Sequence, residues 1–134
     1  EAARAAAAAR AAAQQATADR QLLASYPNEA ELREAHQAKL AQMQQSIETT
    51  QSNLHSQEQN LAELLAHAAD LDRSGQPVPV DLRKRLTEQR KIVADERDEV
   101  THLRGQRAAM AKQLDAELQR YRMLSLKSQN SASN

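Results

Sequence analysis

The chain of 134 residues has no Phe, Trp or Cys, only two tyrosines, and a formal net charge of zero. A compact globular core draws much of its buried area from aromatic side chains, so this composition argues against one. A chain without cysteine forms no disulfides or thiolate metal sites, and no apolar run approaches the about 20 residues of a membrane-spanning helix. Alanine, glutamine and charged residues dominate, which is typical of long helices and coiled coils.

The first 25 residues are rich in alanine, the residue with the highest intrinsic helix propensity. They contain little that a core could bury, so we expect residues 1–25 to form a semi-rigid helical spacer. Residues 26–28 follow as a hinge. Asn28 with Glu31 then matches the capping-box pattern, in which two side chains satisfy free backbone N–H groups, and this predicts the start of a helix.

Residues 29–72 form the first predicted arm, in which mainly apolar positions recur at alternating steps of three and four. An average period of 3.5 residues places them in one stripe along one side of a supercoiled helix. We call this stripe the seam of the arm. Its positions are Leu40, Met43, Ile47, Thr50, Leu54, Gln57, Leu61, Leu64, Ala68 and Leu71.

Residues 80–126 form a second predicted arm with a seam of the same kind. Its positions are Leu82, Leu86, Gln89, Val93, Glu96, Val100, Leu103, Arg107, Met110, Leu114, Glu117, Tyr121 and Leu124. The tail, residues 127–134, has no periodic apolar residue, and we expect it to fray.

A single break, residues 73–79, separates the two arms. Gly75 suits the left-handed position that ends a helix, and Pro79 suits the first turn of the next one. Two matched seams joined by a short turn can fold back and bury each other. The sequence therefore predicts an all-α fold, a long antiparallel two-helix coiled-coil hairpin preceded by an Ala-rich helix.

The distribution of charge supports pairing between the arms. Residues 28–72 carry two basic and eight acidic groups, a formal −6, whereas residues 81–127 carry twelve basic and eight acidic groups, a formal +4. Opposite charges favour one arm pairing with the other over pairing with its own copy. They also argue against a sustained nucleic-acid face, so we expect no nucleic-acid partner.

Polar residues within the seams are candidates for setting the register of the hairpin. If the turn is symmetric, Gln57 lies near Glu96, His36 near Glu117, and Gln89 opposite Leu64. The alternative is that long polar side chains simply reach out of a narrow interface into solvent, which we favour for Gln89.

No motif points to catalysis or to a bound group. Two glycines cannot form a glycine-rich phosphate loop, and a narrow two-helix seam offers no pocket that excludes water. No two histidines have metal-ligand spacing on one helix face. We therefore expect no enzyme activity, cofactor, metal or small-molecule substrate. The histidines are His36, His55, His67 and His102.

The predicted tip of the hairpin is the candidate partner-binding site, with the basic residues Arg73, Arg83, Lys84 and Arg85. A charge run of this kind is also typical of a helix face exposed to solvent. Asp70 and Asp72 lie beside these residues, and hairpins with an acidic tip can enter the secondary channel of RNA polymerase. Here the basic neighbours leave the tip without acidic character, which argues against that role.

Three segments are similar to a family of proteobacterial envelope proteins of unknown function. They are a hinge followed by a capped helix at residues 22–31, a Gly-x-Pro-x-Pro turn within residues 68–82, and a closing Arg-Tyr-x-x-Leu segment at residues 120–124. In that family a small β module precedes the coiled coil, and these 134 residues do not contain it. The resemblance implies a periplasmic or envelope location and transfers no catalytic residue.

The expected function is therefore that of a non-enzymatic structural or interaction module of the cell envelope. Four apolar residues off the seams predict self-association into a four-helix arrangement or docking on a partner protein. An alternative is a regulatory hairpin whose tip inserts into a channel of a larger machine, such as a secretion or pilus apparatus. The off-seam residues are Leu65, Ile92, Leu118 and Leu126.

Overall fold

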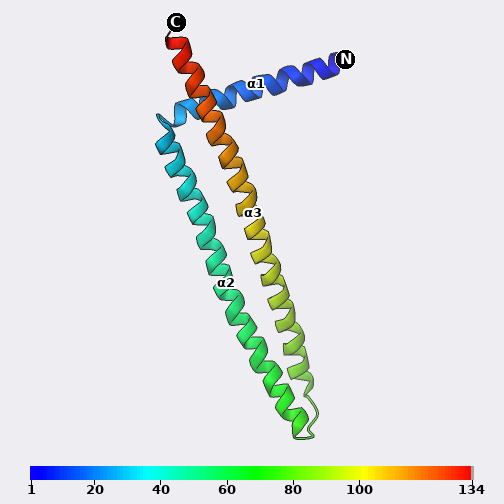
Figure 1. The fold of residues 1–134 in the computed structure, drawn as a ribbon. Helices are drawn as coiled ribbons and strands as arrows, with labels where there is room; N and C mark the ends of the chain where they lie inside the picture. Colours follow the sequence, from blue (N-terminus) through cyan, green and yellow to red (C-terminus); the bar gives the residue numbers. More distant parts are fainter. Residues whose placement is uncertain (134) are drawn as a thin grey trace. The chain divides into compact units, whose positions relative to one another are not determined.

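The computed structural model describes residues 1–133, and throughout this range the protein is all-α, as predicted. Helix α1 spans Ala2–Ser25, α2 spans Glu29–Arg73 and α3 spans Val80–Ala132 (Figure 1). The chain divides into two compact units. One contains residues 1–40 together with the chain from Ala109 onward, and the other contains Ala41–Ala108. We call them the base unit and the tip unit.

In the tip unit, α2 and α3 pack side by side in opposite directions as a helical hairpin (Figure 1). The predicted seam positions of this unit are all buried or half-buried, whereas most positions between them are exposed. Burying a stripe on each helix provides the stability that helices gain from tertiary packing. The most deeply buried side chains of this unit are Ile47, Leu82, Val93 and Val100.

The base unit holds α1, the start of α2 and the end of α3. Its core is formed by Leu32, Leu114 and Tyr121, of which Leu32 is completely buried. Only the last turns of α1 contact this core, because every residue before Asp19 is exposed. Most of α1 therefore owes its helical structure to the high intrinsic helix propensity of its alanines, without help from packing.

Near the hinge, α1 ends and α2 begins with one of the two bonds of the predicted capping box. Tyr26 is extended and ends α1. The Asn28 side-chain oxygen then accepts a hydrogen bond of 2.9 Å from the Glu31 backbone N–H, which caps the start of α2. Satisfying this otherwise free N–H group is the role of an N-cap residue.

The tail prediction is wrong, because α3 continues to Ala132 instead of ending near residue 126. The segment contains no Pro or Gly that would interrupt the helix. Its backbone bonds extend to Ser133, whose N–H donates to the Gln129 carbonyl at 3.1 Å. Local backbone bonding thus continues the helix where apolar periodicity has already stopped. Asn134 lies outside the described residues.

The polar contacts across the tip unit lie on both sides of the predicted register. The Gln89 side chain bonds to Gln57, at 2.7 Å to its Oε1 and 2.9 Å to its carbonyl, and Gln89 also lines a groove together with Leu64, its predicted neighbour. In the other direction Arg97 reaches Glu58 at 3.1 Å. Residues 76–79 form no helical turn and rise beside the end of α2 before α3 begins (Figure 1).

Candidate functional site at the hairpin tip and seam

The tip is a tightly bonded loop between α2 and α3. Gly75 has a φ of +72°, the left-handed conformation that glycine adopts without a steric penalty. Its N–H donates to the Asp72 carbonyl at 3.0 Å, and the Gln76 N–H donates to the Leu71 carbonyl at 2.9 Å. These bonds satisfy carbonyls that the end of α2 leaves free, as in a Schellman-type helix end.

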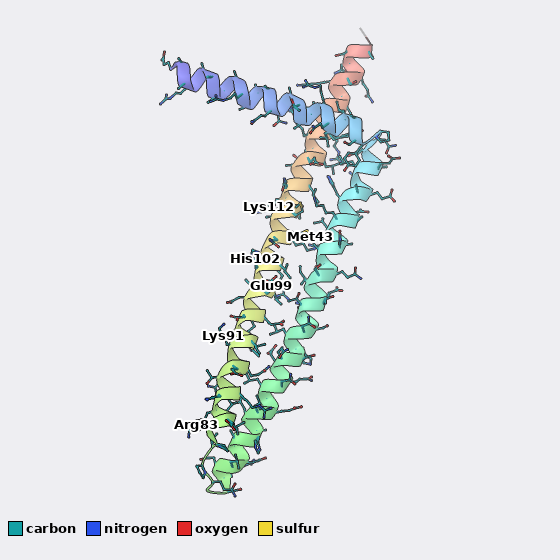
Figure 2. The ribbon with its side chains drawn as sticks, turned by 180° about the vertical axis from the view of Figure 1, so that it is seen from behind. Met43, Arg83, Lys91, Glu99, His102 and Lys112 are labelled. Carbon is teal, nitrogen blue, oxygen red and sulfur yellow. The ribbon has the colours of Figure 1, made fainter. Side chains whose placement is uncertain are left out.

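The predicted tip residues divide into two groups. Arg73 forms an ion pair with Asp70 on the last turn of α2. Arg83 folds back on the loop, where its Nε and a terminal guanidinium nitrogen donate to the Val78 carbonyl at 3.3 and 3.2 Å. Figure 2 shows Arg83 on α3 near the loop. Both arginines therefore contribute to the structure of the tip itself.

Lys84 and Arg85 form the second group. Both are exposed, and neither makes a hydrogen bond or ion pair within residues 1–133. Arg85 lies beside an open groove between α2 and α3 whose lining includes Glu63, Glu88 and Ile92. These two residues are the part of the predicted tip site that is available to a partner.

The polar seam residues of the tip unit do not form the predicted pair. Gln57 bonds to Gln89, and the Glu96 Oε2 is buried without a hydrogen-bond partner among the described residues. The Arg107 Nε is likewise buried without a hydrogen-bond partner among the described residues. A buried polar atom without a partner costs about 1–3 kcal/mol, so these positions weaken the seam locally.

The other predicted pair is present in the base unit. The His36 Nε2 lies 3.1 Å from the Glu117 Oε1, and the His36 side chain is 11% exposed. Within residues 1–133 no group of three His, Cys, Asp or Glu side chains is arranged to hold a metal ion. The contact is a hydrogen bond or ion pair across the seam.

Sequence reasoning missed the strongest polar contact of the base unit. Arg120 donates from Nε and a terminal guanidinium nitrogen to the two carboxylate oxygens of Asp19, at 3.0 and 2.7 Å. Hydrogen bonds from Arg120 and then Gln15 lower the pKa of Asp19 to about 2. Beside this pair, the Tyr121 hydroxyl donates to the Tyr26 carbonyl at 2.7 Å. Together these contacts attach the end of α1 to α3.

A second missed feature lies along one exposed side of α3 in the tip unit, directly beside its seam. Arginine occupies every seventh position over four successive heptads, and all four side chains are exposed. Only one of them has a carboxylate partner within the described residues, because Arg97 reaches Glu58 on α2 at 3.1 Å. A count of charges at a period of seven would have found this set. We call it the arginine row, Arg83, Arg90, Arg97 and Arg104.

These features define the class of the molecule as an all-α helical hairpin with an additional N-terminal helix. No family model, curated protein or solved structure matches the chain. Within residues 1–133, no helix combines the length and apolar character required to cross a membrane.

Proposed function

We propose that this chain is a non-enzymatic structural or interaction module of the bacterial cell envelope that associates with itself or docks on a partner protein. The observation that carries the proposal is the thinness of its core. Among residues 1–133, seven apolar side chains are buried, whereas six large ones are exposed, Leu23, Leu65, Val80, Ile92, Met123 and Leu126. Long helices that share a single seam have most of their surface available for a further partner.

The envelope location is the part of the proposal supported by the resemblance alone. The residues that carry it are the hinge, the Gly-x-Pro-x-Pro turn and the Arg-Tyr-x-x-Leu segment. Fractionation of cells that express the native gene tests it directly, with recovery in the periplasmic or membrane fraction expected and recovery in the cytosol contradicting it.

Sedimentation velocity between about 1 and 100 μM tests the association itself, since mass action makes a self-associating protein sediment faster as it is concentrated. Circular dichroism on the same samples reports helix content. A species that remains monomeric over this range, and that retains no protein from the native cell envelope in a pull-down, would contradict the proposal.

A second candidate is a hairpin that inserts its tip into a channel of a larger machine. The exposed and unengaged Lys84 and Arg85 favour it. Because Arg83 supports the loop through Val78, it should be left unchanged in the test. Replacing Lys84 and Arg85 with Ala should release a captured envelope protein without changing helicity. Retention of that protein by the double variant would favour side-by-side association instead.

A further inference from the structure

The arginine row is one edge of an exposed surface of α3, and a line of carboxylates is the other edge. These carboxylates also recur every seventh residue, and all of them are exposed. We call them the acidic line, Asp81, Glu88 and Asp95. Because seven residues complete two turns of a coiled-coil helix, the row and the line each run straight along α3. They are about 155° apart around the helix, on the side away from the seam.

Between these two edges lie two columns of exposed residues. The column beside the arginine row is small or apolar, Val80, Thr87, Ala94, Thr101 and Ala108. The column beside the acidic line is Lys84, Lys91, Asp98 and Gly105. Together the columns alternate at steps of four and three residues, which is the spacing of a coiled-coil seam. They therefore form a second seam on α3, about 155° around the helix from the one that packs on α2.

The end of the second seam nearest the tip is hollowed. Val80, Arg83, Lys84, Thr87 and Glu88 line this open hollow, and all five belong to α3. The first four have the spacing i, i+3, i+4 and i+7, which is that of the hole that receives one side chain of a facing helix in coiled-coil packing. Val80 is 61% exposed. The hollow thus presents apolar surface that the hairpin itself leaves uncovered.

The lysines of the second seam leave its centre open. The Lys91 Nζ lies 3.6 Å from an Asp95 carboxylate oxygen, so its charge is carried to the edge of the seam. A lysine side chain that reaches out in this way still covers apolar surface with its stem. The Asp95 carboxylate has about four acceptor positions, so it can also bind a cation from a second molecule.

A second copy of α3 complements this surface when the two helices are parallel. Parallel helices that share a seam place opposite edges together, so the arginine row of each copy meets the acidic line of the other. Antiparallel helices would place row against row. In a parallel two-fold pair, each residue of the row faces the position five residues further along the second copy. Arg83 then faces Glu88 of the second copy, and Arg90 faces Asp95 of the second copy.

The other two arginines of the row face no carboxylate in this arrangement. Arg97 faces His102 of the second copy, and it is the arginine that already bonds Glu58 within the hairpin. Arg104 faces an alanine of the second copy. The row is thus divided between a contact inside the hairpin and contacts that a second copy completes.

We propose that two copies of this chain pair through the second seam, with their α3 helices parallel and their tips at the same end. Two-fold symmetry forms each arginine–carboxylate contact twice and closes the assembly as a dimer. Arginine suits the contact because its planar guanidinium binds a carboxylate through two parallel hydrogen bonds. The inference rests on the proposed self-association and deepens it by naming the surface.

Charge reversal in the full chain tests the contact between Arg90 and Asp95. Arg90→Glu places two carboxylates opposite each other, and Asp95→Arg places two guanidinium groups opposite each other. Either variant should weaken self-association in sedimentation velocity by roughly tenfold at about 50 mM salt. An equimolar mixture of the two variants should restore association, because one contact then has its charges exchanged and the other is native.

Arg104→Glu is the matched control, since it makes the same change of charge in the same row but at a position that faces an alanine. Its self-association should stay within about twofold of that of the native chain. Mixing it with Asp95→Arg should not restore association. Circular dichroism verifies that every variant keeps its helices.

A third variant tests the register of the two helices. In a parallel two-fold pair Asp98 faces its own copy across the second seam, and these like charges weaken the dimer. Asp98→Ala should therefore strengthen self-association by about threefold. Unchanged or weaker association of Asp98→Ala would contradict the two-fold register.

The outcomes separate this inference from the function on which it rests. Self-association that survives both Arg90→Glu and Asp95→Arg, or that their mixture does not restore, overturns pairing through the second seam and leaves self-association intact. Equal weakening by Arg104→Glu overturns it as well. A native chain that is monomeric at about 50 mM salt and 100 μM also overturns it, and the proposed function then stands only if an envelope protein is captured.

Discussion

Asp19 and Arg120 are 101 residues apart in the chain, yet their side chains form a two-point ion pair in which both carboxylate oxygens accept a hydrogen bond. The pair lies where the last turns of α1 meet α3, and the Asp19 side chain is only 15% exposed. It is the contact that distinguishes α1 from a free Ala-rich helix. Its chemistry therefore governs whether α1 stays attached.

Acid should detach α1. The unfolded pKa of Asp is about 4, and Arg120 and Gln15 lower the pKa of Asp19 to about 2 in the folded chain. A lowered pKa means that the ion pair stabilises the docked state fully above about pH 4, and that this stabilisation is lost as the pH falls toward 2. Spin labels on cysteines introduced at Ala9 and Lys112 should show the distance distribution broadening in that window. Asp19→Asn should show a broad distribution throughout, and a narrow one would contradict this role of the pair.

Removing the Tyr121 hydroxyl should lower the stability of the base unit. In Tyr121→Phe the Tyr26 carbonyl loses its donor, and an unpaired group of this kind costs about 1–3 kcal/mol. Urea unfolding measures the change. Tyr26→Phe is the control, since the Tyr26 hydroxyl makes no hydrogen bond within the described residues, and it should change the free energy of unfolding by less than about 0.5 kcal/mol. Equal effects of the two substitutions would exclude the proposed role of the Tyr121 bond.

Two isoleucines offer a direct comparison of seam and surface. Ile47 is 2% exposed and Ile92 is 41% exposed. Ile47→Ala should lower the free energy of unfolding by about 2–4 kcal/mol because it leaves a cavity in the seam. Ile92→Ala should cost less than about 1 kcal/mol at concentrations where the chain is monomeric. A larger loss from Ile92→Ala would show that the hairpin seam lies elsewhere.

The two glycines should respond to alanine with opposite signs. Gly75→Ala forces a left-handed conformation on a residue with a Cβ, at a cost of about 1–2 kcal/mol. At Gly105, inside α3, an added Cβ meets no atom within 4 Å. Gly105→Ala should therefore stabilise the helix by about 0.5–1 kcal/mol. The melting temperatures of the two variants, compared with that of the native chain, test this prediction. A higher melting temperature for Gly75→Ala would refute the left-handed geometry of the turn.

The parts of this fold that sequence predicted are those that depend on neighbours within a heptad. Ile47, Val93 and Val100 are buried in the folded chain because a period of 3.5 residues aligns the seam positions on one side of each helix. The Asn28 cap and the Gly75 turn are equally local. Helix ends without such signals were predicted less well, since the backbone after residue 126 needs no apolar seam to stay helical.

Contacts between distant residues were not predictable in the same way. The Gln57–Gln89 pairing depends on how far the loop carries the chain before α3 begins, and Pro77 and Pro79 restrict the loop without specifying that distance. Nothing in the sequence near Asp19 indicates that Arg120 will be its partner. The arginine row differs, because its period of seven can be read directly from the sequence even though it lies off the seam.

The heptads of α3 also limit how the length of the hairpin can change. Residues 82–88 and 89–95 place equivalent side chains at equivalent positions, Leu or Gln in the seam followed by Arg and Lys. Removing one heptad from α3 together with one from α2 would shorten the hairpin by about 10 Å and leave each remaining side chain on its own side. Removing a number of residues that is not a multiple of seven would rotate the arginines on one side of the deletion out of line with those on the other side. The length of the hairpin can therefore change only by whole heptads if its side chains are to keep their positions.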